Sequence, residues 1–188
     1  MTGFWVLKEQ SKFMRFGMMV LFAIGCFATL AVHADPLPAP TWQEYRSTVG
    51  GYRVEVPGKP TELMQDVPNQ PGQKMYAIKL DYGKGGFVIV LSEMAADRVA
   101  AGAEQNLNLI RDAGMKALNA TVINEQRETV GEFPARRVDY NTANGLSGTV
   151  RYVLAERRIF QINAIGPAGF SATPEAKRFL ASFALTGR

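Results

Sequence analysis

The sequence predicts an α+β domain in which an antiparallel sheet is sandwiched between helices, preceded by an N-terminal signal segment. Three observations support this prediction. Apolar residues alternate along several short segments, one long segment changes to helical spacing, and short turn-forming pairs join the later segments. The chain has 188 residues, 47% apolar and 20% charged, which suits one domain with an appendage.

The first 34 residues have the layout of a secretory signal peptide. An uncharged apolar run of 17 residues spans Phe16–Val32, and Lys8, Lys12 and Arg15 precede it. Small residues then follow, ending at Ala34. A basic region, an apolar region and a small-x-small exit are typical of export signals. We therefore expect cleavage after Ala34 and release into the periplasm or outside the cell.

Two other roles for this segment stay open. Residues 16–32 are only slightly short for a spanning helix, so they could attach the protein to the inner membrane with the domain facing outward. The residues Ala23-Ile-Gly-Cys26 loosely resemble a lipobox, which would make the protein a lipoprotein at Cys26. A cysteine that simply fills the apolar run is the favoured interpretation. The true start is Met1 or Met14.

Removal of residues 1–34 leaves 154 residues and lowers the formal net charge from +4 to +2. Cys26 and His33, the one cysteine and the one histidine of the chain, both lie in the removed segment. This excludes a disulfide framework, a zinc site built on Cys or His, and a His-based triad from the mature chain. No cofactor or metal is expected. The small positive excess and the exported location argue against nucleic acid as a partner.

Residues 35–41 are rich in proline and predict a stiff linker, so the domain is expected at 42–188. Residues 52–56 alternate apolar and charged side chains, as in a half-buried strand, and a Pro-Gly turn ends it. A second alternating strand is predicted at 76–82. The continuous apolar run 87–91 predicts a central strand that is covered on both faces.

Residues 97–118 carry apolar side chains at steps of three or four, with charges between them, which predicts an amphipathic helix. Its buried stripe is expected to include Val99, Leu107 and Ile110. Short turns then join four predicted strands into an antiparallel meander, at about 121–129, 132–140, 147–155 and 158–165. These turns are expected at Gly131, Asn144-Gly145 and Glu156-Arg157. Thr173, Pro174 and Glu175 predict the N-terminus of a last helix, whose buried side includes Phe179 and Phe183.

Five motifs extend this pattern. They are Gly-Tyr-x-Val-x-Val-Pro-Gly-Lys-Pro at 51–60, Gly131-Glu-Phe-Pro-Ala-Arg136, an arginine-bearing strand at Arg151-Tyr152, Arg158-Ile-Phe-Gln161 and the closing Phe179-Leu-Ala-Ser-Phe183. Together they resemble the small exported bacterial domains grouped with PsbP and DcrB, over roughly residues 42–186. The resemblance implies an antiparallel sheet between helices and a non-enzymatic role in binding or assisting other proteins. The chain departs from that family's Gly-x-Pro-Gly stretch, where it has Phe133-Pro134-Ala135.

Arginines cluster in the predicted C-terminal strands. We expect Arg136 and Arg151 on neighbouring strands, where planar donors could bind a carboxylate or a phosphate, and Arg158 opens the next strand. The favoured alternative is an ordinary solvated sheet face. There the arginines would pair with nearby acids, namely Glu125, Glu128, Glu132, Asp139 and Glu156.

Trp42 and Tyr45 follow the proline-rich linker directly. Exposed aromatic side chains at such a place could stack on a ligand or anchor a partner. A tryptophan at the start of a domain more often covers the core, and this is the favoured interpretation.

No Gly-x-Ser-x-Gly, Ser-x-x-Lys or Asp-x-Asp spacing focuses a catalytic hypothesis. We therefore predict an exported, non-catalytic binding or accessory domain whose partner is another envelope protein or an envelope component. Two alternatives stay open. A small-ligand carrier predicts an apolar cavity between sheet and helix. A carboxylate-dependent hydrolase predicts a deep pocket with clustered acids whose pKa values are raised.

Overall fold

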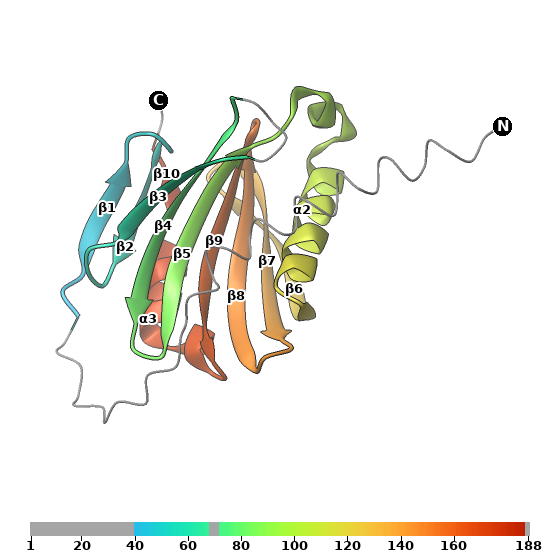
Figure 1. Cartoon of the computed structure of the whole chain (residues 1–188). Coiled ribbons are helices and arrows are strands. Elements are labelled where there is room, and N and C mark those ends of the chain that lie inside the picture. Colours follow the sequence, from blue (N-terminus) through green and yellow to red (C-terminus); the bar gives the residue numbers. More distant parts are fainter. Residues whose placement is uncertain (1–39, 68–71, 187–188) are drawn as a thin grey trace.

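A computed structural model describes residues 40–67 and 72–186 of the chain, and these residues form two antiparallel sheets with two α-helices (Figure 1). The small sheet has the order β1 (Gln43–Ser47), β2 (Tyr52–Val56), β10 (Ala184–Leu185). The large sheet has the order β3 (Thr61–Asp66), β4 (Lys74–Tyr82), β5 (Gly85–Glu93), β9 (Arg158–Pro167), β8 (Leu146–Ala155), β7 (Phe133–Thr142), β6 (Ala120–Val130).

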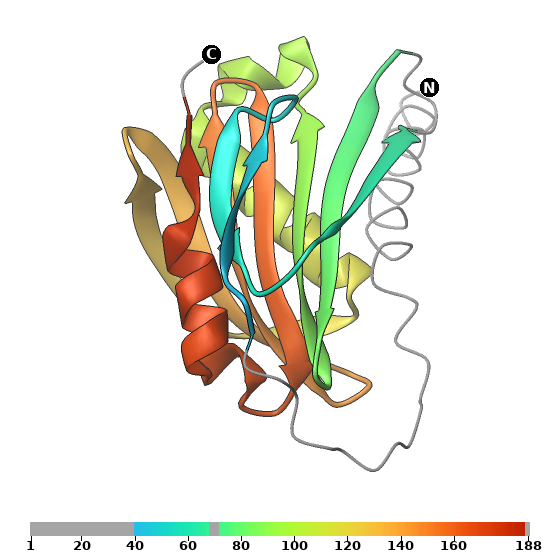
Figure 2. The same cartoon turned by 90° about the vertical axis from the view of Figure 1, so that its left-hand side faces the viewer.

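The large sheet is the middle layer of the molecule. Helix α2 (Ala103–Ala117) packs against β6, β7 and β8 on one face. Helix α3 (Pro174–Ser182) and the small sheet lie on the opposite face, where α3 contacts β2 and β9 (Figure 2). The predicted α+β architecture, with an antiparallel sheet between helices, is confirmed. The small sheet was not predicted, and it takes the strand expected at 52–56 out of the main sheet.

The alternation of side chains along the strands separates the two main parts of the core. In β9, Phe160 and Ile162 face α3 and the small sheet, whereas Ile159 and Ile165 face α2. Residues 85–92 of β5 are all buried, so the prediction of a central strand covered on both faces is confirmed.

The prediction of one long helix over residues 97–118 was wrong at the N-terminal end of that range. Residues Ala96–Ala101 form a 3₁₀ helix, η1, and α2 begins only after Gly102. Gly102 has a φ of 84°, a backbone conformation that interrupts an α-helix and that glycine adopts readily. As a result Val99, expected on the buried stripe, is exposed, whereas Leu107 and Ile110 are buried as predicted.

The N-terminus of α3 is confirmed in detail. Thr173 is the N-cap and its hydroxyl oxygen accepts a hydrogen bond from the Ala176 N–H at 3.2 Å, with Pro174 as the first helical residue. Phe183, expected within the helix, follows its last residue, but its side chain is buried in the same core.

Three strands of the structure were not predicted from the sequence, namely β1, β3 and β10. The signal segment, its cleavage after Ala34 and residues 35–39 of the predicted linker lie outside the described residues. No helix within residues 40–67 and 72–186 is long and apolar enough to cross a membrane.

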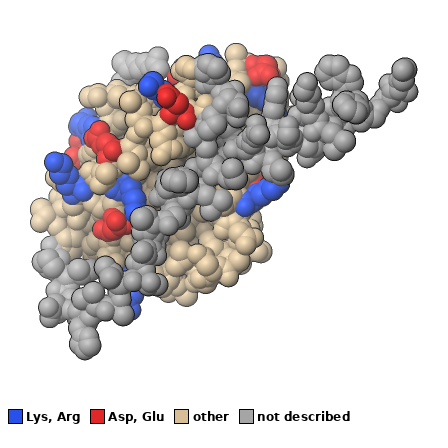
Figure 3. Space-filling view, viewed as in Figure 1, with Lys and Arg blue, Asp and Glu red and all other residues tan. Residues whose placement is uncertain are grey.

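The described residues on the face seen in Figure 3 carry both signs of charge. Lysines and arginines lie among aspartates and glutamates, and they do not gather into a field of one sign. On this face, a binding site would therefore depend on individual charged groups and not on a field of one sign.

Candidate functional site

The structure separates the two arginines that were expected to form one site. Arg136 in β7 and Arg151 in β8 do lie on neighbouring strands, but Arg136 is opposite Tyr152, and Arg151 is opposite Arg137. Successive side chains of a strand point to opposite faces, so this offset of one residue places them on different faces of the sheet. They cannot bind one anion together.

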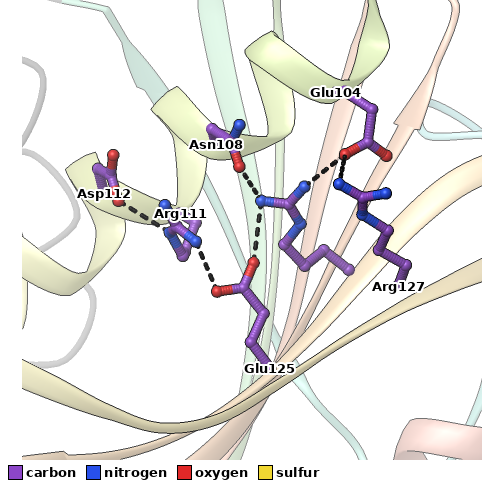
Figure 4. Close-up of polar contacts among 7 residues, drawn as sticks. Glu104, Asn108, Arg111, Asp112, Glu125 and Arg127 are labelled. Carbon is purple, nitrogen blue, oxygen red and sulfur yellow. Dashed lines mark hydrogen bonds and ion pairs between the residues drawn. The ribbon is translucent and has the colours of Figure 1, made fainter.

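Arg136 faces α2 and is almost completely buried, with 2% of its surface exposed. Its Nη2 lies 2.8 Å from Glu104 Oε2, and its Nη1 lies 2.9 Å from Glu125 Oε1 and donates to Asn108 Oδ1. Glu104 and Asn108 are four residues apart on α2, so both side chains project from one face of the helix toward β7 (Figure 4).

Further charges extend this network. Arg111 on α2 donates to Glu125 Oε2 at 2.5 Å and to Asp112 Oδ1 at 2.8 Å, and Arg127 on β6 lies 3.2 Å from Glu104 (Figure 4). The hydrogen bond to Asp112 and then that to Glu125 raise the pKa of Arg111. We call Glu104, Asn108, Arg111, Asp112, Glu125, Arg127 and Arg136 the helix–sheet network.

The helix–sheet network has three positive and three negative side chains, so it is balanced without any ligand. Its members join α2 to β6 and β7. Arg136 Nε is buried and has no hydrogen-bond partner among residues 40–67 and 72–186. This arrangement fixes the helix on the sheet, and it leaves Arg136 no surface on which to meet a partner.

Arg151 lies on the opposite face and is also engaged. Its Nε lies 2.5 Å from Glu128 Oε1, and its Nη1 donates to the Leu180 carbonyl oxygen at 2.7 Å. Leu180 is in the last turn of α3, where helix carbonyls lack partners within the helix. Arg151 therefore caps the C-terminal end of α3.

A groove of about 820 Å³ opens on this face. Its walls come from the turn between β6 and β7, from the turn between β8 and β9, and from β10. The lining residues are Thr129–Phe133, Arg151, Glu156, Arg158, Ala181 and Phe183–Thr186. The aromatic ring of Phe183 and the side chain of Val130 are buried in the core, so the groove has an apolar floor and charged rims.

β10 presents an unpaired edge to this groove. Within the described sheets it pairs with β2 alone. The Thr186 N–H donates to the Gly51 carbonyl oxygen at 2.9 Å. Since bonded and unbonded residues alternate along an antiparallel pair, the N–H and C=O of Leu185 point away from β2.

Arg158 stands at the rim of this groove, and it differs from the other two arginines. Its Nη1 donates to the Gly50 carbonyl oxygen at 3.2 Å, and its guanidinium carbon lies 5.7 Å from the centre of the Phe160 ring. No acidic side chain of residues 40–67 or 72–186 lies within ion-pair distance of it.

Trp42 and Tyr45 lie outside the groove lining. Trp42 packs against the core and stacks under the Arg178 guanidinium at 4.4 Å. The Tyr45 hydroxyl donates to Glu62 at 2.9 Å; burial, followed by this bond, raises the pKa of Tyr45 to about 12. Both aromatic side chains thus serve the packing of the small sheet, in line with the favoured interpretation.

Within the described part of the chain, no three acidic, histidine or cysteine side chains lie close enough to hold a metal ion. Sequence reasoning missed Asn108 and the lining contributed by β10. The spacing of Glu104 and Asn108, four residues apart on one helix, was a usable signal for the first. β10 has only two residues, so it carries no periodic signal.

No family model matches the sequence, and no curated protein matches it either. Among solved structures, the chain is similar to cyanobacterial PsbP (CyanoP) from Synechocystis, with a TM-score of 0.51 and 14% identity over 82% of this chain and 98% of that one. A protein of unknown function from Pseudomonas aeruginosa has a TM-score of 0.44, with 13% identity over 70% and 86% of the two chains. A protein from Bacteroides thetaiotaomicron has a TM-score of 0.42, with 15% identity over 77% and 48%. The chain therefore has a PsbP-like fold.

Proposed function

We propose that this chain is an exported, non-catalytic binding domain of the cell envelope, and that it holds a protein partner in the groove between the β6–β7 turn and β10. One observation carries the proposal. The groove combines an unpaired strand edge with a guanidinium, that of Arg158, which has no acidic partner among the described residues.

The strand edge suits a protein partner in particular. An extended segment of another protein can add to a free edge, where main-chain hydrogen bonds give affinity and side-chain pockets give specificity. The outward N–H and C=O of Leu185 offer such a bond pair. The apolar floor below them would take a side chain of the added segment.

Arg158 supplies the polar half of the interaction. A guanidinium has five N–H donors, and one hydrogen bond to Gly50 leaves several of them for a carboxylate of the partner. Arg136 and Arg151 are less suited, because their guanidinium groups already meet acids inside the protein. Of the three predicted arginines, we therefore assign the partner contact to Arg158.

Export rests on the leader at residues 1–34 and is tested separately. Mass spectrometry of the protein recovered from cells should find Asp35 as the first residue. An intact Met1 or Met14 would instead indicate an anchored protein, and a lipidated Cys26 would indicate a lipoprotein.

Site-specific crosslinking tests the groove. A photoreactive residue at Glu132, which is exposed on the groove rim, should capture a partner in intact cells. The same residue at Asp81, which is also exposed but lies outside the groove, is the matched control. The Arg158→Glu substitution should abolish the Glu132 crosslink. Equal products from both positions, or a Glu132 product that survives Arg158→Glu, would contradict the proposal.

A small-ligand carrier is the second candidate, because about 820 Å³ lies in the range of ligand pockets. Native mass spectrometry of the exported protein separates the two, since a carrier would retain a small molecule. A hydrolase is a weaker candidate function. Glu132 and Glu156 do line the groove, but both are exposed, whereas general acid catalysis by a carboxyl at neutral pH needs shielding from water.

A further inference from the structure

A second free strand edge lies on the large sheet, away from the groove. β3 is an end strand and pairs with β4 alone among the described strands (Figure 2). It has six residues in unbroken register, contains no proline, and five of the six are exposed. An exposed strand edge of this kind is a template for pairing with another chain unless something protects it.

The hydrogen-bond pattern shows which groups of β3 are available. The Val67 N–H donates to the Gln73 carbonyl oxygen at 2.9 Å, and bonded and unbonded pairs alternate from there along the register with β4. Leu63 and Gln65 therefore bond to β4. The N–H and C=O groups of Glu62, Met64 and Asp66 point outward.

The other end strand of the large sheet, β6, is protected. Its register shifts between Val122 and Asn124, a bulge that disturbs pairing with a further strand. β3 has no such irregularity. Its side chains must therefore decide what pairs with it.

Those side chains carry negative charge around an apolar centre. Glu62 accepts a hydrogen bond from the neutral Tyr45 hydroxyl, which leaves its charge uncompensated, and Asp66 lies 3.5 Å from Lys74 in an exposed pair that contributes little. Glu62, Met64 and Asp66 share one face of the sheet, and 60% of the Met64 surface is exposed. Leu63 lies on the other face, on the side of its register partner Ala77. A complementary strand would be basic on the first face, where lysine stems can cover Met64 while their ammonium groups reach the two acids, and apolar on the second.

The same charges disfavour a second copy of this chain. An antiparallel copy that uses the outward groups and pairs the whole strand has its two-fold axis at Met64. In this arrangement Glu62 of each copy lies directly opposite Asp66 of the other copy, so two pairs of like charges face each other. Like charges directly opposite each other destabilise a strand pair.

We propose that the free edge of β3 is a second protein-binding site, which accepts an extended segment with alternating basic and apolar residues. The segment adds to the large sheet as an eighth strand, antiparallel or parallel to β3. This site shares no residue with the groove, so either site can exist without the other.

The probe is the synthetic peptide Ac-KVKVKVK-NH2, and Ac-EVEVEVE-NH2 is its control of opposite charge. Fluorescence anisotropy with the exported protein should detect binding of the lysine peptide alone, with an affinity that falls as salt is added. Met64→Pro removes an outward N–H without removing a bond to β4, which an edge strand tolerates. It should weaken binding at least tenfold.

Met64→Thr keeps the N–H and removes most of the apolar side chain that the lysine stems would cover. It should weaken binding clearly less than Met64→Pro does, which separates loss of the backbone donor from loss of the side chain. Ile123→Pro on the protected edge, where 61% of the residue's surface is exposed, should leave binding unchanged. Circular dichroism confirms that each variant is folded. The proposal is overturned if the lysine peptide fails to bind, if it binds Met64→Pro as it binds the wild type, or if both peptides bind equally. Self-association that Met64→Pro abolishes would overturn the choice of a basic partner.

Discussion

Replacing Arg136 with methionine removes the buried guanidinium of the helix–sheet network and keeps a side chain of similar length. The substitution leaves Glu104 and Glu125 without their shared partner. Removing one member of a fully buried ion pair costs about 3–5 kcal/mol. Here the cost is smaller, because Glu104 is 53% exposed and Glu125 keeps its contact with Arg111.

We expect a loss of about 2–3 kcal/mol in the free energy of unfolding. For a chain of this size that corresponds to a fall of roughly 4–12 °C in melting temperature. Urea unfolding followed by circular dichroism measures the free energy. Arg127→Met is the matched control, because it removes a partner of the same Glu104 carboxylate from a side chain that is 78% exposed.

The control should change the free energy of unfolding by less than about 0.5 kcal/mol, as exposed ion pairs do. Equal effects of the two substitutions would refute the reasoning, because burial would then not decide the strength of the contact. An Arg136→Met protein as stable as the wild type would also refute it.

Three more perturbations follow from single contacts. Gly114→Ala on α2 places a Cβ against the hydroxyl oxygen of the buried Tyr152, where there is no room for it, and should cost about 1–3 kcal/mol in urea unfolding. Thr173→Ala removes the cap of α3 and should cost about 1 kcal/mol by the same measurement, whereas Thr173→Ser should cost little. The pKa of Tyr45 is raised from its ordinary 10.0 to about 12, so the folded protein favours the neutral hydroxyl. The stability that this hydroxyl contributes is complete below pH 10 and is lost as the pH rises toward 12. Urea midpoints between pH 9 and 12 should therefore fall less in Tyr45→Phe than in the wild type, and identical falls would contradict this.

The features that were predicted from the sequence depend on local chemistry. The N-terminus of α3 follows from a threonine, a proline and a glutamate in three consecutive positions. The turn at Gly145 and the central strand β5 also follow from short-range composition. Such signals need no knowledge of what packs on the segment.

The features that were missed depend on contacts between distant residues. β3 is nearly all exposed and β10 has two residues, so only their partner strands identify them. The separation of Arg136 from Arg151 depends on register, in which a change of one residue moves a side chain to the other face. The groove likewise arises where three distant segments meet.

The affinity of the purified protein for the partner captured at Glu132 tests the central claim most directly. Arg158→Glu should raise the Kd at least tenfold, because it replaces the guanidinium without an acidic partner on the groove rim by a carboxylate. Arg127→Glu, on an exposed side chain outside the groove, should leave the Kd within about twofold. A Kd that Arg158→Glu does not change, or that both substitutions raise equally, would contradict binding in the groove.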